Sequence, residues 1–529
     1  MRRGQSQGIH LLGRYKLVLM LMVVTILLCF GSAANALTGA IVINSGAAYT
    51  ASPSVTLAIS ATDPPPGSGV SQMRISNNPD LSGGTGWIAY ATSRPWTLQS
   101  IEGTRTVYIQ FKDRAGNLSS VYSDSIFLDT NSPTATTFLI NDGAEITRSR
   151  SVTLTVSAYD PDPGSGIKRM MISNYPSFYG GRWYSYSTTK AWKLDIAEGT
   201  TTVYIKFEDN AGNTSTYSDQ IFLDTKRPVG QSAQLGGAIR IDNNAYATND
   251  TTVTLSISAF DLAPGTGVSQ MRISNNPDLS GGTGWIAYAT SYNDWVLNSS
   301  EGTQTVYIQF KDGAGNESLV YKDSIILDTV GPTGSVLIEG GSECTRSRWV
   351  TLSISANDTE PASGVRFMRI SNHSDFSDGT GWKIFSATKR WKLDSTEGTT
   401  TVYIQFMDRA GNISPVYSDE IFLDTKRPVG SSLNAFIIND REYATNTTTV
   451  SLSISAYDPE PGTGVVEMMI SNNYDFSGAT WEAYATSRSW ELTPGDGIKI
   501  AYIKFRDLAG NESFVYSDDI FLDTVAPTP

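Results

Sequence analysis

Carboxylates are the residues of this sequence whose type and spacing could do chemistry. They recur at three places along the chain: in a Leu-Asp-Thr phrase, in loops such as Asp160-Pro161-Asp162, and in an Asp-x-Ala-Gly-Asn turn. If the fold brings these three places to one pole of a domain, their oxygens would face one another. Calcium takes six to eight oxygen ligands, so the pattern predicts calcium sites where one repeated segment meets the next.

Four such junction sites are predicted, and each joins the aspartate of one Leu-Asp-Thr phrase to acids of the following segment. The predicted sets are Asp129 with Asp160, Asp162 and Asp209; Asp224 with Asp261 and Asp312; Asp328 with Asp358, Glu360 and Asp408; and Asp424 with Asp458, Glu460 and Asp507. The first segment has no preceding phrase, so we expect weaker binding there or none. An alternative needs no ion, because Asp and Asn hydrogen-bond to their own backbone in turns where Gly supplies positive φ.

Aromatic residues form a second candidate site. Two tryptophans recur in every segment, Trp87 and Trp96 in the first. Trp96 precedes Leu98 with strand alternation, so we expect it in the core. Trp87 and Tyr90, or Tyr108 beside Arg74, could form an exposed face for stacking on a glycan, although packing within and between domains explains flat rings equally well.

Enzymatic chemistry is not indicated. Beyond residue 36 the sequence holds one cysteine, Cys344, and one histidine, His373. Cys344 aligns with Ile146, an apolar strand position, and His373 aligns with Asn78 and Tyr175 in a loop. Nucleotide-binding, CxxC and zinc-protease motifs do not occur. We therefore expect no catalytic residues and no cofactor other than calcium.

The N-terminus resembles a secretion signal. A basic stretch that includes Arg14 and Lys16 precedes an apolar run from Leu17 to Phe30, and Ala34-Asn35-Ala36 offers small residues for cleavage before Leu37. The alternative is an uncleaved N-terminal anchor. Cleavage would remove four of the 39 basic residues and leave 493 residues with a net charge of −17. That charge disfavours nucleic acid and anionic membrane as partners.

An internal repeat is the main feature of the remaining sequence. The phrase Val-Tyr-Ile-Gln-Phe, which begins at Val107, occurs five times with small changes, and each copy is followed by the Asp-x-Ala-Gly-Asn turn and Leu-Asp-Thr. The last asparagines of these turns are spaced 96, 103, 96 and 99 residues apart. A duplicated two-segment unit of about 198 residues underlies the pattern, because residues 69–93 and 267–291 are identical.

Within a segment the hydrophobic period is two, which indicates strands. Val55, Leu57 and Ile59 alternate with polar residues. Seven strands per segment are predicted. In the first segment they fall at about residues 39–46, 54–62, 70–77, 86–92, 95–99, 105–113 and 121–129. Seven short strands in about 97 residues predict an all-β sandwich.

The segments resemble known repeats. Tyr108-x-x-Phe111-x-Asp113-x-Ala115-Gly116-Asn117 is similar to the sixth strand and following turn of fibronectin type III and bacterial immunoglobulin-like repeats. The resemblance implies five tandem seven-stranded β-sandwiches after a signal peptide of residues 1–36. The five expected domains are residues 37–131, 132–228, 229–331, 332–428 and 429–529.

These observations predict a secreted or surface-exposed, non-catalytic rod of Ig-like repeats. It would act as a spacer and an interaction or adhesion module, with a protein or polysaccharide at the cell surface as its partner and no membrane contact after cleavage. The alternative is a non-catalytic carbohydrate-binding extracellular protein.

Overall fold

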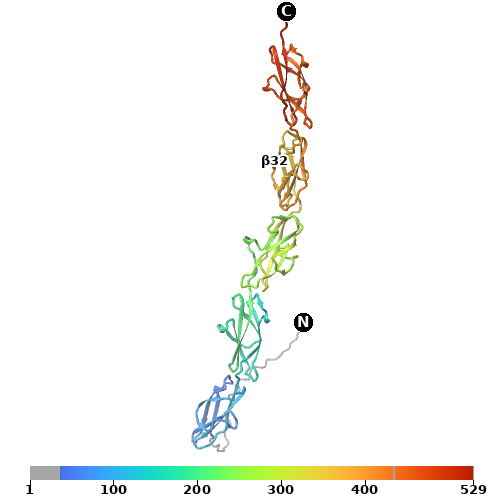
Figure 1. Cartoon of the computed structure of the whole chain (residues 1–529). Coiled ribbons are helices and arrows are strands. Elements are labelled where there is room, and N and C mark those ends of the chain that lie inside the picture. The colour runs from blue at the N-terminus through green and yellow to red at the C-terminus, as the bar shows by residue number, and fades with distance from the viewer. Residues whose placement is uncertain (1–35, 433–434, 528–529) are drawn as a thin grey trace, which may run out of the picture. The chain divides into compact units, whose positions relative to one another are not determined.

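The computed structural model describes residues 36–432 and 435–527, so the predicted signal peptide lies outside the described residues except for Ala36. The chain divides into two compact units, residues 1–225 and 226–529. The described part of the first unit holds two β-sandwiches, here called sandwiches 1 and 2, and the second holds sandwiches 3 to 5 (Figure 1). No helix among the described residues is long and apolar enough to cross a membrane.

Each sandwich of the first unit contains eight strands. Sandwich 1 consists of β1 (Thr38–Ile43), β2 (Tyr49–Thr50), β3 (Ser54–Thr62), β4 (Val70–Ser76), β5 (Ile88–Ala89), β6 (Ser93–Thr97), β7 (Gly103–Asp113) and β8 (Tyr122–Leu128). Sandwich 2 consists of β9 (Thr134–Ile140), β10 (Ile146–Thr147), β11 (Ser151–Tyr159), β12 (Ile167–Ser173), β13 (Arg182–Tyr184), β14 (Thr189–Lys193), β15 (Gly199–Asp209) and β16 (Thr214–Leu223). Each first strand is followed by a 3-10 turn, η1 (Asn44–Gly46) or η2 (Asn141–Gly143).

The second unit repeats this order. Sandwich 3 consists of β17 (Val229–Gly230), η3 (Ala233–Leu235), β18 (Ile239–Ile241), β19 (Ala247–Thr248), β20 (Thr252–Ile257), β21 (Ala259–Phe260), β22 (Val268–Ser274), β23 (Ile286–Ala287), β24 (Ser291–Val296), β25 (Gly302–Asp312) and β26 (Tyr321–Leu327). Sandwich 4 consists of β27 (Thr333–Ile338), β28 (Cys344–Thr345), β29 (Trp349–Asn357), β30 (Val365–Ser371), β31 (Lys383–Ile384), β32 (Thr388–Lys392), β33 (Gly398–Asp408) and β34 (Tyr417–Leu423). Sandwich 5 consists of β35 (Val429–Gly430), β36 (Phe436–Ile438), η5 (Asn439–Arg441), β37 (Ala444–Thr445), β38 (Thr449–Ile454), β39 (Ala456–Tyr457), β40 (Val465–Ser471), β41 (Glu482–Ala483), β42 (Ser487–Glu491), β43 (Gly497–Asp507) and β44 (Tyr516–Leu522).

Two sheets of unequal size make each sandwich. In sandwich 1 the smaller sheet has the order β1-β3-β6, and the larger has the order β2-β8-β7-β4-β5. All neighbours pair antiparallel except β2, which runs parallel to β8. In the larger sheet β8 pairs with β2, and β7 pairs with β4. Strands from the first half and from the C-terminal part of the segment therefore lie side by side.

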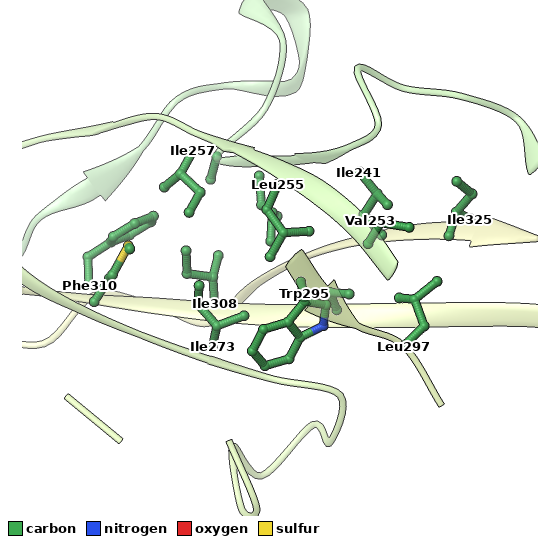
Figure 2. Packing of buried hydrophobic residues seen from close by; sticks show 14 residues of the cluster. Ile241, Val253, Leu255, Ile257, Ile273, Trp295, Leu297, Ile308, Phe310 and Ile325 are labelled. Carbon is green, nitrogen blue, oxygen red and sulfur yellow. The ribbon is translucent and has the colours of Figure 1, made fainter. Parts of the chain in front are cut away.

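The core of each sandwich lies between its sheets. In β7 the alternating Val107, Ile109 and Phe111 are fully buried, as the hydrophobic period of two predicts, while Tyr108 and Gln110 lie on the other face. Figure 2 shows the same arrangement in sandwich 3, where Ile308 and Phe310 pack with Leu255 and Ile257 of the opposite sheet. Among the described residues, five such clusters form the cores, one in each sandwich.

The number of strands differs from the prediction. Sandwich 1 has eight strands, not seven. The additional strand is formed by Tyr49 and Thr50, which pair with Phe127 and Leu128 of the larger sheet. A two-residue strand has no measurable hydrophobic period, so the sequence pattern could not reveal it. Sandwiches 3 and 5 add a further short pair, β17 with β21 and β35 with β39.

Candidate functional site: carboxylate clusters beside the linkers

Three clusters of aspartates lie where a linker enters a sandwich, one in the first unit and two in the second. In each cluster, one carboxylate oxygen of every member lies within 4.8 Å of the others. The clusters are Asp129, Asp160 and Asp209; Asp328, Asp358 and Asp408; and Asp424, Asp458 and Asp507. The arrangement gathers three negative charges in a small volume.

The remaining acids predicted for these three sites are not part of the clusters. Asp162, Glu360 and Glu460 are exposed and do not belong to these clusters. They follow the cluster aspartate by two residues in a loop that turns their side chains into solvent, where a charge keeps its hydration. The remaining predicted set divides between the two units: Asp224 follows β16 in the first, and Asp261 and Asp312 belong to the second.

The linker aspartate is held by the sandwich that it enters. Asp129 directly follows β8 and is fully buried. Its Oδ2 accepts the backbone N–H of Ser165 at 2.8 Å, and its carbonyl oxygen accepts the Asn213 side-chain amide at 2.8 Å. The equivalent bonds run from Ser363 and Asn412 to Asp328, and from Thr463 and Asn511 to Asp424.

The turn aspartate is saturated by its own turn. Asp209 Oδ1 accepts the N–H groups of Gly212 at 2.6 Å and Asn213 at 2.9 Å, and Oδ2 accepts the Asn213 side-chain amide. Gly212 has a φ of 100°, a conformation that favours glycine. Turn chemistry therefore accounts for this aspartate in full.

The loop aspartate is different, because one of its oxygens lacks a partner. Asp160 follows β11, and its Oδ2 accepts the N–H of Gly166 at 2.6 Å. Its Oδ1 is buried without a hydrogen-bond partner, and so is Oδ1 of Asp458 in sandwich 5. A buried carboxylate oxygen without a donor is costly, and a cation would satisfy it.

Burial and mutual repulsion raise the pKa of the loop aspartates. Desolvation raises the pKa of Asp160, with further increases from the charges of Asp129 and Asp209. Burial, together with the charges of the two aspartates in its own cluster, also raises the pKa of Asp358 and raises the pKa of Asp458 to about 6. The clusters are therefore electrostatically strained when fully ionised, which is the condition that a bound cation relieves.

Sandwich 1 offers an internal comparison because no Leu-Asp-Thr phrase precedes it. Asp63 and Asp113 occupy the positions of Asp160 and Asp209, but the sequence has no third acid to complete the set. Hydrogen bonding from the Asn117 side chain lowers the pKa of Asp113. This turn therefore stabilises its carboxylate in the ionised form.

A second contact, which sequence reasoning missed, fixes the other side of the linker. The N–H of Thr130 donates to Glu102 at 3.0 Å, and its hydroxyl donates to the same carboxylate. Corresponding pairs are Thr225 with Glu198, Thr329 with Glu301, Thr425 with Glu397 and Thr524 with Asp496. The signal was present as a Glu-Gly-Thr where the long strand begins in four repeats, replaced by Asp-Gly-Ile in the fifth. Adjacent Asp129 and Thr130 thus bond to the following and the preceding sandwich.

The predicted glycan-face residues divide between two environments. The Arg74 guanidinium carbon and the Lys112 ammonium lie 4.9 and 5.3 Å from the ring centroid of half-buried Trp87. Arg74 also donates to Gln110, which shares the outer face of β7 with Tyr108. Tyr90 instead packs on the core, with its ring edge-to-face on Phe111, and its hydroxyl accepts the N–H of Ala61 at 3.0 Å.

Cys344 does not have the properties of a nucleophilic cysteine. Cys344 lies half-buried in β28, as the alignment with Ile146 in β10 suggested. Burial raises the pKa of its thiol, and nearby Asp507 and Asp424 raise it further. A nucleophilic cysteine needs the opposite shift.

Comparisons with known proteins found only distant similarities. No protein-family model and no curated protein sequence matches the chain. The fibronectin(III)-like modules of Clostridium thermocellum CbhA share 13% identity over 35% of this chain and 94% of theirs, with a TM-score of 0.23. The FN1–FN3 domains of chicken CNTN1 share 12% identity over 54% and 97%, with a TM-score of 0.24. The human Desmocollin-1 ectodomain shares 11% identity over 86% and 93%, with a TM-score of 0.20.

The strand order identifies the architecture. The repeats are immunoglobulin-like and fibronectin type III-like sandwiches. A three-stranded sheet of the first, second and fifth main strands faces a sheet built on the third, sixth and seventh, which is the arrangement of that fold. This fold hosts many functions, which depend on the sites that each protein carries on it.

Proposed function

We propose that this chain is an extracellular, non-catalytic repeat protein that acts as a spacer and interaction module, with linkers fixed by calcium. The observation that carries the proposal is the carboxylate cluster around the linker aspartates Asp129, Asp328 and Asp424. Asp424 shows it best, since Asp458 and Asp507 meet it and the pKa of Asp458 is raised to about 6. Secretion is supported by the leader-like sequence of residues 1–36.

The residues present suit calcium. Three carboxylates supply hard oxygens and a charge of −3 at each cluster, and calcium completes its six to eight ligands with carbonyls and water. The buried, unpartnered Oδ1 of Asp160 and of Asp458 is a free ligand position. Calcium bound there would bridge the linker to the sandwich that follows, so a spacer would become stiffer when calcium is present.

A calcium titration of residues 37–529 tests this function. We expect the melting temperature to rise from chelator to millimolar calcium, and isothermal titration to detect binding to the junction clusters. Asp458→Asn should reduce the calorimetric stoichiometry, whereas Asp63→Asn, at the same position of sandwich 1, should leave it unchanged. Equal melting curves with calcium and with chelator, together with no binding heat, would contradict calcium-fixed linkers.

A second candidate function is carbohydrate binding at the outer face of the larger sheet. It is favoured by Trp87, whose ring lies near Arg74 and Lys112, and by Trp285, which lies 4.6 Å from Arg272 and 3.8 Å from Lys311. Aromatic rings flanked by donors suit stacking on sugars. A glycan array probed with the chain and with the double variant W87A/W285A would test it. Binding that disappears in the variant supports this function, and an array without binding rejects it.

A further inference from the structure

We infer that sandwich 4 carries a site for a zinc-class divalent metal, formed by His373, Asp378 and Asp394. His373 Nε2 lies 3.9 Å from Asp378 Oδ2 and 3.8 Å from Asp394 Oδ2. One ligand atom from each of the three residues lies within 4.8 Å of the others. An imidazole nitrogen combined with two carboxylates is a donor set that zinc prefers, whereas calcium prefers oxygen alone.

The geometry needs little adjustment. Donor atoms at about 2.0–2.1 Å in a tetrahedral site lie about 3.4 Å apart, so each carboxylate would close on the imidazole nitrogen by about half an ångström. The side chains of His373 and Asp394 are about half exposed, at 53% and 43%, so they have room to move and leave the fourth position to water. Two carboxylates would also neutralise the charge of the ion.

Neighbouring residues orient the two carboxylates. The Ser371 hydroxyl donates to Asp378 Oδ1, and the Asn372 amide donates to Asp394 Oδ1 at 3.2 Å. In both aspartates the hydrogen bond engages Oδ1 and leaves Oδ2 directed at the imidazole. Such outer contacts are what holds metal ligands in place.

The sister repeats show that this constellation is particular to sandwich 4. The position of His373 is Asn78, Tyr175, Asn276 and Asn473 in the other four repeats, and the position of Asp378 is Gly83, Gly180, Gly281 and Gly478. In sandwich 2 the equivalents of His373 and Asp394 instead form a hydrogen bond, from Tyr175 to Asp195 at 2.8 Å. His373 and Asp378, in one loop, therefore both differ from the sister repeats, and both are residue types that bind metals.

The competing interpretation is an ion pair of protonated His373 with its acidic neighbours. These neighbours are Asp378, Asp394 and Asp375; hydrogen bonds from Ser377 chiefly lower the pKa of Asp375, and the charge of His373 adds to them. Arg348 lies on the other side of Asp394 and donates to its carbonyl. An ion pair accounts for attraction between these side chains but predicts no response to zinc.

The test uses residues 37–529 labelled with 15N-histidine, in which His373 is the only imidazole. Zinc is added in the presence of millimolar calcium, so that the carboxylate clusters beside the linkers are occupied independently. We expect zinc to shift the ring-nitrogen signals of His373 and to bind with one equivalent that His373→Asn removes. Asp378→Gly and Asp394→Asn, which copy residues of sister repeats, should weaken binding at least about tenfold.

Melting curves of the three variants control for folding. An imidazole signal that zinc leaves unmoved would overturn the inference. So would an unchanged zinc affinity in both Asp378→Gly and Asp394→Asn, because the histidine would then bind zinc without a site. Either result would leave the calcium proposal untouched, since that depends on other residues.

Discussion

At the residue scale, one phenylalanine anchors each sandwich. Phe111, Phe207, Phe310, Phe406 and Phe505 are all fully buried at the same position of the long strand. In sandwich 4 the ring of Phe406 packs between Phe385 and Tyr417, with centroid separations of 6.1 and 6.0 Å. A large ring at this position therefore fills the space between the two sheets in every sandwich.

We predict that Phe406→Ala destabilises sandwich 4 by about 3–5 kcal/mol, the usual range for deleting a buried aromatic ring and leaving a cavity. Chemical denaturation of the chain measures the loss. Ser353→Ala, on the exposed face of β29, is the control and should stay within about 0.5 kcal/mol. A loss below about 1 kcal/mol for Phe406→Ala would mean that the core collapses around the missing ring.

A natural substitution isolates one hydroxyl group. The hydroxyl groups of Tyr90, Tyr186, Tyr288 and Tyr484 each accept the backbone N–H of an alanine, and sandwich 4 has Phe385 at this position. We predict that Phe385→Tyr stabilises sandwich 4 by about 1 kcal/mol through a bond to the N–H of Ala356. Tyr484→Phe should cost sandwich 5 a similar amount. Denaturation midpoints that move in the same direction in both variants would refute the shared role.

At the element scale, a linker inside a unit is held by hydrogen bonds to the sandwiches on both of its sides. Thr329 bonds back to Glu301, while Asp328 bonds forward to Ser363 and Asn412. A segment that would otherwise be four residues of loop before Pro332 therefore has little freedom. Loss of either contact should release the linker without unfolding the sandwiches beside it.

We predict that Glu301→Gln speeds hydrogen exchange at the Thr329 amide, because the charge-assisted bonds to the carboxylate are replaced by weaker ones. Glu301→Asp is the matched control, since Asp496 makes the same contact in sandwich 5 with the N–H of Thr524 at 3.0 Å. Exchange measured by mass spectrometry of the peptide around Thr329 reports the change. Equal acceleration in both variants would assign the effect to side-chain length and not to charge.

Much of this architecture could be predicted from sequence because its signals are local and repeated. The alternation of Val107, Ile109 and Phe111 gave both the strand and its buried face. The meeting of Asp129 with Asp160 and Asp209 followed from the order of strands in a sandwich. Side-chain direction in loops has no such period. The sequence therefore predicts Asp162 in the cluster, whereas its side chain is exposed to solvent.

The missed contacts share one physical cause. His373 and Asp378 lie in a loop after β30, and nothing in their spacing shows that Asp394, beyond the next hairpin, approaches them. The bond of Thr130 to Glu102 likewise joins residues 28 positions apart. Contacts between loops depend on tertiary geometry, which periodicity does not encode.

At the scale of the whole molecule, the cores are separate. The five hydrophobic clusters share no residue, and each draws its members from one repeat. We therefore predict that a fragment of residues 332–429 melts cooperatively with the circular dichroism of a β protein. A broad, non-cooperative melt would show that sandwich 4 depends on its neighbours for stability.

The linker clusters should also make stability depend on pH in a direction opposite to most carboxylates. The pKa of Asp458 is raised to about 6, chiefly by burial and then by the charges of Asp424 and Asp507. A carboxyl whose folded pKa exceeds its unfolded value stabilises the fold while it is protonated. Its contribution is complete below the unfolded pKa of about 4 and disappears as the pH rises through about 6.

We predict that, in chelator, the chain melts several degrees higher at about pH 5 than at about pH 7.5. The change is reduced by partial solvation of Asp458, and about 1 kcal/mol corresponds to about 4–8 °C in a domain of this size. Calcium competes with the proton for the same oxygens, so it should raise the melting temperature more at the higher pH. Asp424→Asn removes one of the repelling charges, so it should flatten the pH dependence of the unfolding transition of sandwich 5. Asp63→Asn should not change it. A melting temperature that stays constant across this range in chelator, and does not respond to Asp424→Asn, would show that the ionised cluster is tolerated without proton or cation.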